Sequence, residues 1–405
     1  MAVHVPVDDD VGLLPLRDQV EPPLAFRAFN ECPSPDLSVV DLSDPSKADL
    51  YSYKSAHVVM ITIIYPCLCT VGLVANLAFL VSVWRVKYMR TITNIYLSNL
   101  AVADIIFLVT GTSFGLWKYF VTPVTSDFSL CGGPVGCFAL VHLNATPFQA
   151  STLLVTLVSL ERYLAICRSI YHHRINSQKR TVGLVVCVWL AAILLSSVLS
   201  SSGTEYTTTC VSWPAEDKYR SYPQTIASCF TLGAVWLHAA SFAVYVVPYF
   251  IEFTIAVVVF YKILNTLQKR SNISGTVSAQ PGANDNVNRI RNRVAFMLVI
   301  AGITSFSLVT PRVIVTIYSY VIFFAGITGP LTQDQIFVIY ITVNLLLYLN
   351  SVLNPFIYAF CNSRYRASVV EAFFGRCVSS GNNMSYERDT NMANNDANRR
   401  TETTM

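Results

Sequence analysis

The sequence predicts an all-α membrane protein: a seven-transmembrane helix bundle followed by a short cytoplasmic amphipathic helix. Of the 405 residues, 53% are hydrophobic and only 13% are charged, whereas about a quarter of an ordinary soluble domain is charged. The charged residues are concentrated between long uncharged runs. A run of about 20 apolar residues is long enough to cross the hydrocarbon core of a bilayer as a helix. A soluble fold would need helix after helix to be apolar on every side.

Seven such runs follow one another, and each is too long for a buried strand. They cover approximately residues 57–84, 93–117, 134–165, 181–203, 230–261, 294–324 and 334–360. The chain therefore divides into an N-terminal tail (1–56), a seven-helix domain (57–377) and a C-terminal tail (378–405). No pair of halves is repeated, so a transporter built from structural repeats is not supported.

Basic residues indicate the orientation of the bundle, because cytoplasmic loops carry an excess of Lys and Arg. Lys and Arg are enriched in segments 85–92, 166–180 and 262–293 and again beyond residue 360. The first 56 residues instead hold ten Asp or Glu against four Lys or Arg. We therefore expect a multi-pass protein of the plasma membrane with its N-terminus outside. The net charge of +4 then reflects membrane orientation and does not indicate nucleic-acid binding.

Both tails are polar, and we expect both to be disordered. The N-terminal tail is acidic and contains several prolines, which predicts a flexible extracellular segment. The C-terminal tail is rich in Ser, Thr and Asn and predicts a disordered cytoplasmic segment. Cys377 follows the expected amphipathic helix and is a candidate for palmitoylation.

Five of the eleven cysteines fall outside the membrane or at its outer edge, where the environment favours disulfides. Cys137 opens the third helix, and Cys210 lies in the loop between helices four and five. We expect a Cys137–Cys210 bridge that holds this loop over the mouth of the bundle. Cys131 and Cys229 could form a second bridge, or one of them could pair with Cys32.

Glu161 and Arg162 stand side by side in an otherwise apolar helix. Arg162 lies 25 positions after Cys137, roughly 37 Å along a helix, so it reaches the inner membrane boundary. We expect Glu161 to neutralise Arg162, because a charged side chain at this depth is costly. The alternative is that the two charges only mark the end of the helix.

An ordered set of residues, one signature per helix, gives the chain a family resemblance. The signatures are GLVAN with Asn76, NLAVAD with Asp104, Cys137 followed by ERY, Trp189, Pro248, Pro311, and NSVLNPFIY with Asn354, Pro355 and Tyr358. With these signatures residues 57–377 resemble the rhodopsin-like (class A) G-protein-coupled receptors. Residues 87–104, KYMRTITNIYLSNLAVAD, are also similar to receptors of the thyrotropin-releasing hormone and neuromedin U groups.

This resemblance implies a switch that contacts a heterotrimeric G protein and arrestin. In it, Arg162 is the G-protein contact and Glu161 restrains it at rest. The full implied set is Glu161, Arg162, Tyr163, Asn354, Pro355 and Tyr358. The resemblance also implies a pocket for a sodium ion, formed by Asp104, Ser151, Asn350 and Asn354, and the alternative occupant is water.

A short neuropeptide is the ligand that we expect. Amine receptors carry an Asp where this chain has Asn144, and retinal needs a Lys that segment 334–360 lacks. The outer half instead offers polar and aromatic groups: Trp117, Asn144, Gln149, His238, Arg312, Tyr340 and Asn344. Arg312 could bind a peptide carbonyl, amide or carboxylate oxygen, or it could pair internally with Glu205.

Three positions depart from the family pattern and predict an atypical switch. Val309 replaces the usual tryptophan of helix six, and Ala256 replaces a tyrosine of helix five. Glu252 within helix five is also unusual, and it could join the inner polar network or pair with a base. A lipid or small-molecule receptor, a non-signalling scavenger and, less favoured, a transporter or channel remain alternatives. No enzyme motif or cofactor site is recognised apart from the sodium pocket, and membrane lipids are expected partners.

Overall fold

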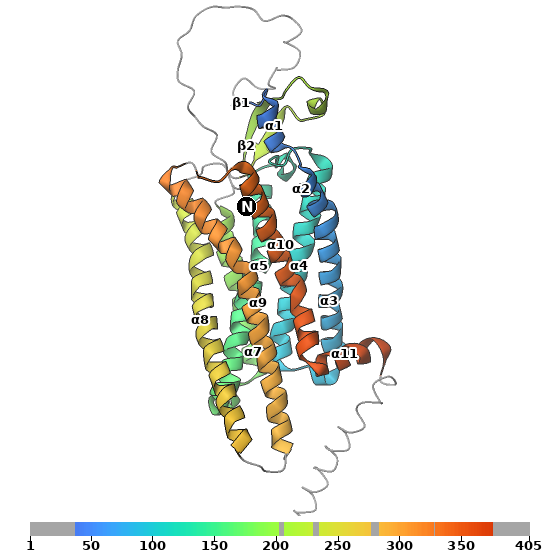
Figure 1. The fold of residues 1–405 in the computed structure, drawn as a ribbon, viewed down its shortest axis with the longest axis vertical. Coiled ribbons are helices and arrows are strands. Elements are labelled where there is room, and N and C mark those ends of the chain that lie inside the picture. Colours follow the sequence, from blue (N-terminus) through green and yellow to red (C-terminus); the bar gives the residue numbers. More distant parts are fainter. Residues whose placement is uncertain (1–36, 202–205, 230–234, 277–282, 328, 376–405) are drawn as a thin grey trace, which may run out of the picture.

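The computed structural model describes residues 37–201, 206–229, 235–276, 283–327 and 329–375. Within them, seven helices are long and apolar enough to cross a membrane, as predicted. Five are the single helices α4 (Ile92–Val121), α5 (Pro134–Cys167), α7 (Gln178–Ser201), α9 (Ala283–Ala325) and α10 (Gln333–Cys361). The first span runs through α2 (Ser55–Val59), a π-helical turn (Met60–Ile64) and α3 (Tyr65–Arg85), and the fifth is α8 (Val235–Thr276). They stand side by side as one bundle (Figure 1).

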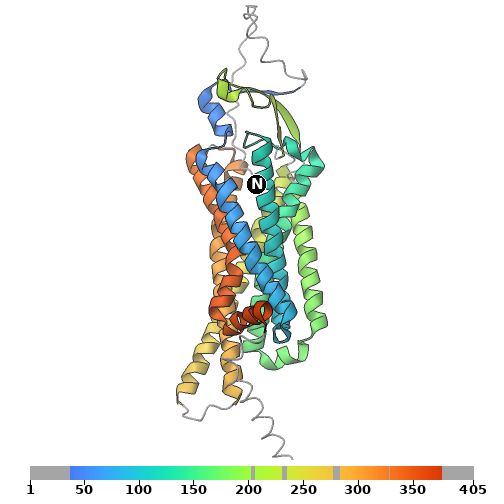
Figure 2. The ribbon, with the colours of Figure 1, turned by 90° about the vertical axis from the view of Figure 1, so that its right-hand side faces the viewer.

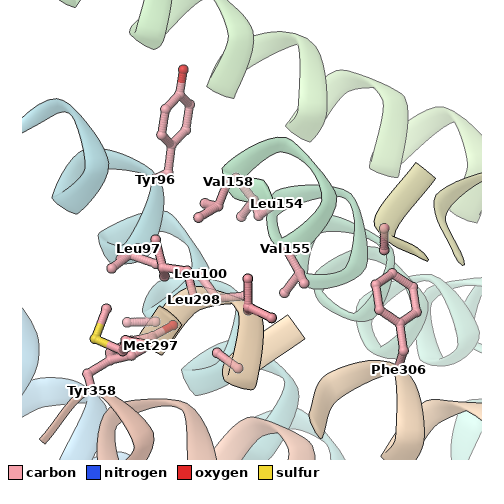
Figure 3. Close-up of a cluster of buried hydrophobic side chains, with 14 of the residues drawn as sticks. Tyr96, Leu97, Leu100, Leu154, Val155, Val158, Met297, Leu298, Phe306 and Tyr358 are labelled. Atoms are coloured by element: carbon pink, nitrogen blue, oxygen red, sulfur yellow. The ribbon is translucent and has the colours of Figure 1, made fainter. Parts of the chain in front are cut away.

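The core lies where α4, α5, α9 and α10 meet near one end of the bundle. Figure 3 shows Leu97 and Leu100 of α4 close to Leu298 of α9, with Tyr358 of α10 beside them. Leu154 on α5 is fully buried in the same cluster. Each fully buried Leu side chain contributes about 1.5–3 kcal/mol relative to exposure to water. Lipid already removes apolar side chains from water, so the association of the helices within a membrane depends on close packing between them.

A short helix, α11 (Ser363–Phe374), lies across this end of the bundle (Figures 1 and 2). Asn362 caps it by accepting a hydrogen bond from the Arg364 amide at 3.0 Å. Its Tyr365, Ser368 and Ala372 are buried, and Arg85 of α3 donates to the Ala372 carbonyl at 2.8 Å. The predicted amphipathic helix is therefore present, and we call this end of the bundle the α11 end.

The opposite end carries a small folded cap, and we call it the cap end. Strands β1 (Val39–Asp41), β2 (Thr207–Ser212) and β3 (Thr225–Ser228) form a sheet in which β1 is parallel and β3 antiparallel to β2. Helix α1 (Pro45–Tyr51) follows β1. Figures 1 and 2 show the cap standing above the bundle.

The prediction of a wholly flexible N-terminal tail is wrong for residues 37–56. Asp44 caps α1 by accepting from the Ser46 amide at 2.9 Å. Leu42 and Ala48 are buried against Val124 and Tyr219 of the loops between the helices. The apolar positions of this segment therefore have partners far away in sequence, which its acidic composition concealed.

The predicted Cys137–Cys210 disulfide is also wrong, because Cys137 is bonded to Cys229 with the Cα atoms 5.4 Å apart. Cys229 directly follows β3, and the Phe128 amide donates to the Ala227 carbonyl at 2.8 Å, which places the end of β3 beside α5. Cys210 lies further up the sheet, opposite Val39 of β1, and is disulfide-bonded itself. The considered Cys131–Cys229 pair is not bonded in this structure, since the Cys131 thiol is free. Cys32 and Cys377 lie outside the described residues.

Short helices and turns complete the chain. They are the 3-10 turns Lys87–Met89, Ser129–Cys131 and Asp217–Tyr219, and helix α6 (Ser169–Ile175) between α5 and α7. Helix α6 lies at the α11 end and brings His172 back toward α5. This placement decides the environment of Glu161.

Candidate functional site

A buried polar cluster lies in the middle of the bundle around Asp104 of α4. The Asp104 carboxylate is fully buried. Ser151 of α5 donates to its Oδ1 at 3.2 Å, and Asn354 of α10 donates to its Oδ2 at 2.9 Å. Asn350 is buried one turn earlier on α10. The structure thus brings Ser151 and Asn354, two of the residues predicted for the polar pocket, into contact with Asp104.

Asn76 extends this cluster to α3. Its side-chain amide donates to the Gly72 carbonyl at 2.9 Å and to the Ser351 carbonyl at 3.2 Å. Ser351 precedes Pro355 by one turn, in the part of α10 where proline removes a backbone donor. Four helices are therefore linked through polar groups in the apolar core, where each such group must find a partner inside the protein.

The predicted pair of Glu161 and Arg162 is not formed in the structure. Its Oε1 accepts hydrogen bonds from Arg180 of α7 at 2.8 Å and from the Tyr96 hydroxyl at 3.1 Å. Its Oε2 lies 3.3 Å from Nε2 of His172 on α6. Neighbouring side chains point about 100° apart around a helix, so Glu161 reaches Tyr96, His172 and Arg180, while Arg162 reaches Thr93 of α4.

Burial lowers the pKa of His172, and the Glu161 carboxylate beside it acts in the opposite direction. The net direction is downward, so the imidazole is neutral at pH 7. The positive charge in hydrogen-bond contact with Glu161 is therefore that of Arg180.

Arg162 donates a hydrogen bond to the Thr93 hydroxyl of α4. Its Nε has no hydrogen-bond partner among the described residues. Tyr163, the next residue, lies under Lys262 of α8, with the ammonium 5.5 Å from the ring centroid. The guanidinium is thus held by one neutral partner, which restrains it less than a carboxylate would.

Tyr358 of α10 is buried beside the same region, and its ring centroid lies 5.7 Å from that of Phe79. Its hydroxyl has no hydrogen-bond partner among the described residues. Ala256 of α8, where the sequence lacks a tyrosine, is buried and can offer none. Pro355 lies inside α10 three residues earlier.

Toward the cap end, Arg312 of α9 forms the centre of a second cluster. Its guanidinium lies 5.0 Å from the ring centroid of Tyr340 on α10 and close to the Tyr245 hydroxyl of α8. Arg312 is 9% exposed. It has no ion pair among the described residues, and its Nη1 lacks a hydrogen-bond partner there. The considered partner Glu205 lies outside those residues.

The other predicted ligand residues are distributed over several helices. Asn144 donates to the Leu140 carbonyl at 2.9 Å and accepts from Thr110 at 3.5 Å, so its amide is engaged within the bundle. Gln149, one turn deeper, is buried with its amide nitrogen unpaired among the described residues.

Three further predicted ligand residues make no described contact with Arg312. Trp117 is 54% exposed near the end of α4. His238 of α8 contacts the Phe323 ring, with centroids 5.0 Å apart. Asn344 is half-buried on α10, one turn from Tyr340 toward the α11 end. Among the described contacts, the cluster of Arg312, Tyr340 and Tyr245 therefore does not include these three residues.

Comparison with known proteins identifies the family of this chain. The sequence model described as 7 transmembrane receptor (rhodopsin family) matches residues 75–358, which is more than half of the chain. The chain belongs to the rhodopsin family of seven-transmembrane receptors. The predicted resemblance is confirmed, and a receptor family agrees with the expectation that the protein is not an enzyme.

Individual relatives match the receptor over different lengths. The thyrotropin-releasing hormone receptor of Mus musculus is 32% identical over 36% of this chain and 34% of its own length. Neuromedin-U receptor 2 of Mus musculus is 24% identical over 76% of this chain and 73% of its own. Neuropeptide Y receptor type 2 of Macaca mulatta is 25% identical over 82% and 81%. The chain thus spans about a third of the thyrotropin-releasing hormone receptors that it matches.

Sequence reasoning missed a small cavity of about 10 Å³ between α5, α8 and α9 of the receptor, with room for about one water molecule. Its lining includes Gln149, Thr152 and Glu252. Both carboxylate oxygens of Glu252 lack a hydrogen-bond partner among the described residues, and the Thr152 hydroxyl donates to the Gln149 carbonyl at 3.1 Å. Among the described residues no base pairs with Glu252, and its polar neighbour is the Thr152 side chain. In the sequence, only the lone negative charge of Glu252 signalled the site.

Sequence reasoning also missed Arg180 and His172 as partners of Glu161. We expect Glu161→Gln to lower the free energy of unfolding by about 1–3 kcal/mol, because it removes a charge-assisted hydrogen bond to a partner that is 30% exposed. Thermal unfolding of the purified receptor measures the change.

A double-mutant cycle with Arg180→Gln identifies the partner. If Arg180 balances Glu161, the double variant loses little more stability than either single variant. Additive losses would contradict the pairing. Arg174→Gln, on the same connection but in no described ion pair, serves as the matched control.

Proposed function

We propose that the receptor binds a short extracellular peptide and activates a heterotrimeric G protein at the plasma membrane. The cap end faces outward in this proposal and the α11 end faces the cytoplasm, as the distribution of Lys and Arg indicates. The observation that carries the proposal is the buried Arg312 beside Tyr340 and Tyr245, with no carboxylate partner among the described residues.

Burying an unpaired guanidinium in a membrane bundle is costly, so such groups mark ligand or ion sites. The planar group can donate two parallel hydrogen bonds to a carboxylate or to the carbonyl of a terminal amide. Tyr340 and Tyr245 add aromatic surface and hydroxyl groups. A peptide terminus matches this combination, and the relatives named above are receptors for thyrotropin-releasing hormone, neuromedin U and neuropeptide Y.

Signal transfer runs toward the α11 end in this proposal. Arg162, whose one hydrogen-bond partner among the described residues is the neutral Thr93, is free to exchange this contact for the G protein when the bundle opens. Tyr163, Asn354, Pro355 and Tyr358 line the same route. Arrestin would use the same opening, and membrane lipids surround the exposed apolar faces of the helices.

We also propose that the Asp104 cluster binds a sodium ion in the resting receptor. Its carboxylate and the Ser151 hydroxyl provide oxygen donors of the kind that a hard cation prefers. The unpaired Asn76 Oδ1 offers another oxygen near this cluster. Asp104, Ser151, Asn350 and Asn354 would hold the ion, which would supply a positive charge to the buried carboxylate.

Removing the Asp104 charge tests this site. We expect Asp104→Asn to abolish the dependence of agonist affinity on sodium, because a neutral amide cannot balance a cation. Competition binding in sodium chloride and in an equal concentration of N-methyl-glucamine chloride measures the effect. Sodium sensitivity equal to that of the wild type would overturn the sodium proposal and leave a water-filled cluster.

The function is tested with a library of short amidated and free-acid peptides applied to cells that express the receptor with a promiscuous G protein. The expected result is calcium release at nanomolar peptide that is absent in mock-transfected cells. Silence with the receptor at the surface would overturn the peptide proposal. Peptide uptake without nucleotide exchange would instead indicate a scavenger, the alternative that Val309 in place of tryptophan favours.

A further inference from the structure

The segment Cys131-Gly-Gly-Pro-Val-Gly-Cys137 folds back on itself at the start of α5. Gly132 and Gly133 adopt φ angles of +66° and +131°, which residues with a side chain rarely adopt. Pro134 then begins the helix with its φ angle already set. The segment thereby returns Cys131 toward the first turn of α5.

Gly136 makes this approach possible. A Cβ atom at Gly136 would lie 1.9 Å from the Cys131 carbonyl oxygen, which is far inside contact distance. The first turn of α5 and the backbone of Cys131 can therefore pack together only because this position has no side chain. Three glycines and one proline thus serve to hold Cys131 against Cys137.

The consequence is a free thiol beside a disulfide. The sulfur atoms of Cys131, Cys137 and Cys229 all lie within 4.8 Å of one another. Cys137 and Cys229 are bonded and fully buried, whereas Cys131 is reduced and partly exposed. A thiolate that reaches a disulfide sulfur can displace the other sulfur without any added oxidant or reductant.

We propose that Cys131 is a thiol–disulfide exchange site that moves the disulfide of this receptor between alternative cysteine pairs. The Cys131 thiol first loses its proton to solvent. The thiolate then attacks one sulfur of the Cys137–Cys229 bond, a new bond to that sulfur forms, and the other cysteine leaves as a thiolate that takes up a proton. One disulfide and one thiol are present before and after the step.

The two directions of attack have different structural results. Attack on Cys229 gives a Cys131–Cys229 bond, which keeps the end of β3 fastened to the same corner of the bundle. Attack on Cys137 gives a Cys131–Cys137 bond and releases Cys229, so the loop between α7 and α8 loses its covalent link to α5. The exchange therefore reaches the segment that forms part of the cap.

Nearby charges set the rate of exchange. Burial raises the pKa of the Cys131 thiol, the ammonium of Lys118 from α4 opposes this, and Asp127 of the intervening loop reinforces it. The net direction is upward, so little thiolate is present at neutral pH. The thiolate fraction, and with it the exchange rate, should rise about tenfold per pH unit below the thiol pKa.

Differential alkylation of the purified full-length receptor tests the proposal. The receptor is held for increasing times at neutral pH or at about pH 9 without an alkylating agent, free thiols are then rapidly labelled with light N-ethylmaleimide at mildly acidic pH, the disulfides are reduced, and the released thiols are labelled with heavy N-ethylmaleimide. We expect light label on Cys137 or Cys229 to appear with time in the wild type, and about tenfold faster per pH unit. Complete protection of both cysteines at both pH values would overturn the proposal.

Three variants provide the comparison. In Cys131→Ser, light label should be absent from Cys137 and Cys229, whereas Cys69→Ser, which removes a free cysteine from the first span, should behave as the wild type. Gly136→Ala should slow the exchange, because the added Cβ displaces Cys131. Exchange that persists unchanged in Cys131→Ser would show that another thiol is responsible and would overturn the assignment.

A second measurement uses Cys137→Ser. If Cys131 can reach Cys229, peptide mapping without reduction should recover a Cys131–Cys229 bond formed in the oxidising secretory pathway. Alkylation of both cysteines in receptor that reaches the surface would contradict the proposed reach of Cys131. The labelling of the wild type decides the matter if this variant does not fold. Neither measurement needs a ligand, so both are independent of the proposed peptide function.

Discussion

Replacing Arg162 with alanine is expected to lower G-protein activation strongly while leaving peptide binding and surface expression close to those of the wild type. The guanidinium makes one described hydrogen bond, to Thr93, so its removal costs the resting fold little. A charged hydrogen bond to a partner is worth about 1.5–3 kcal/mol, which corresponds to roughly a 10- to 150-fold loss of coupling. Agonist-stimulated nucleotide exchange on purified G protein measures the loss.

Two further variants separate the switch from general damage. Thr93→Ala removes the partner of Arg162 in the resting state and is expected to raise basal exchange, because it releases the guanidinium. Arg168→Ala removes an exposed arginine beyond the end of α5 and should leave coupling near the wild-type value. Full coupling in Arg162→Ala at equal surface density would contradict the assigned role.

The sequence alone was enough to predict the membrane spans. Each span is apolar over a length that only a bilayer-crossing helix explains, and the signal is local. The partners of Asp104 were predicted through the family resemblance, whereas the residues alone indicated only that an isolated carboxylate in an apolar helix has a functional role. Helix α11 was predicted from its amphipathic pattern.

What the sequence did not predict depends on contacts between distant segments. Residues 37–56 were predicted to be part of a flexible acidic tail, because the residues against which they pack, Val124 and Tyr219, belong to loops far along the chain. The pairing of Cys137 depended on which end of the β2–β3 hairpin lies over α5, and cysteine positions do not encode this.

The partner of Glu161 was mispredicted for a geometric reason. Adjacent residues were expected to neutralise each other, but neighbouring side chains on a helix diverge, and partners lie three or four positions away or on other helices. Arg180 lies in the first turn of α7, at the same depth in the membrane as Glu161 near the end of α5, so the two side chains meet. The position of Arg180 at the start of the next apolar run was the sequence signal that could have identified it as the partner of Glu161.

Replacing Arg312 with alanine is expected to weaken the response to the agonist by roughly 10- to 150-fold, the equivalent of about 1.5–3 kcal/mol for a lost charge-assisted hydrogen bond. The guanidinium is buried against Tyr340 and has no carboxylate partner among the described residues, so its charge is available to the ligand. Radioligand binding and calcium release both measure the shift, and surface expression is quantified in parallel.

Arg312→Lys is the matched variant, because it retains the charge and removes the planar fork that binds two oxygens at once. If a peptide terminus is bound in fork geometry, lysine restores only part of the lost affinity. Comparison of the amide and free-acid forms of the same peptide then identifies the group bound. If Arg312 binds a carboxylate, Arg312→Ala should reduce the affinity of the free acid more than that of the amide. Equal potency of the wild type and Arg312→Ala for both forms would contradict the role of Arg312 and would move the ligand contact toward Asn144, His238 and Asn344.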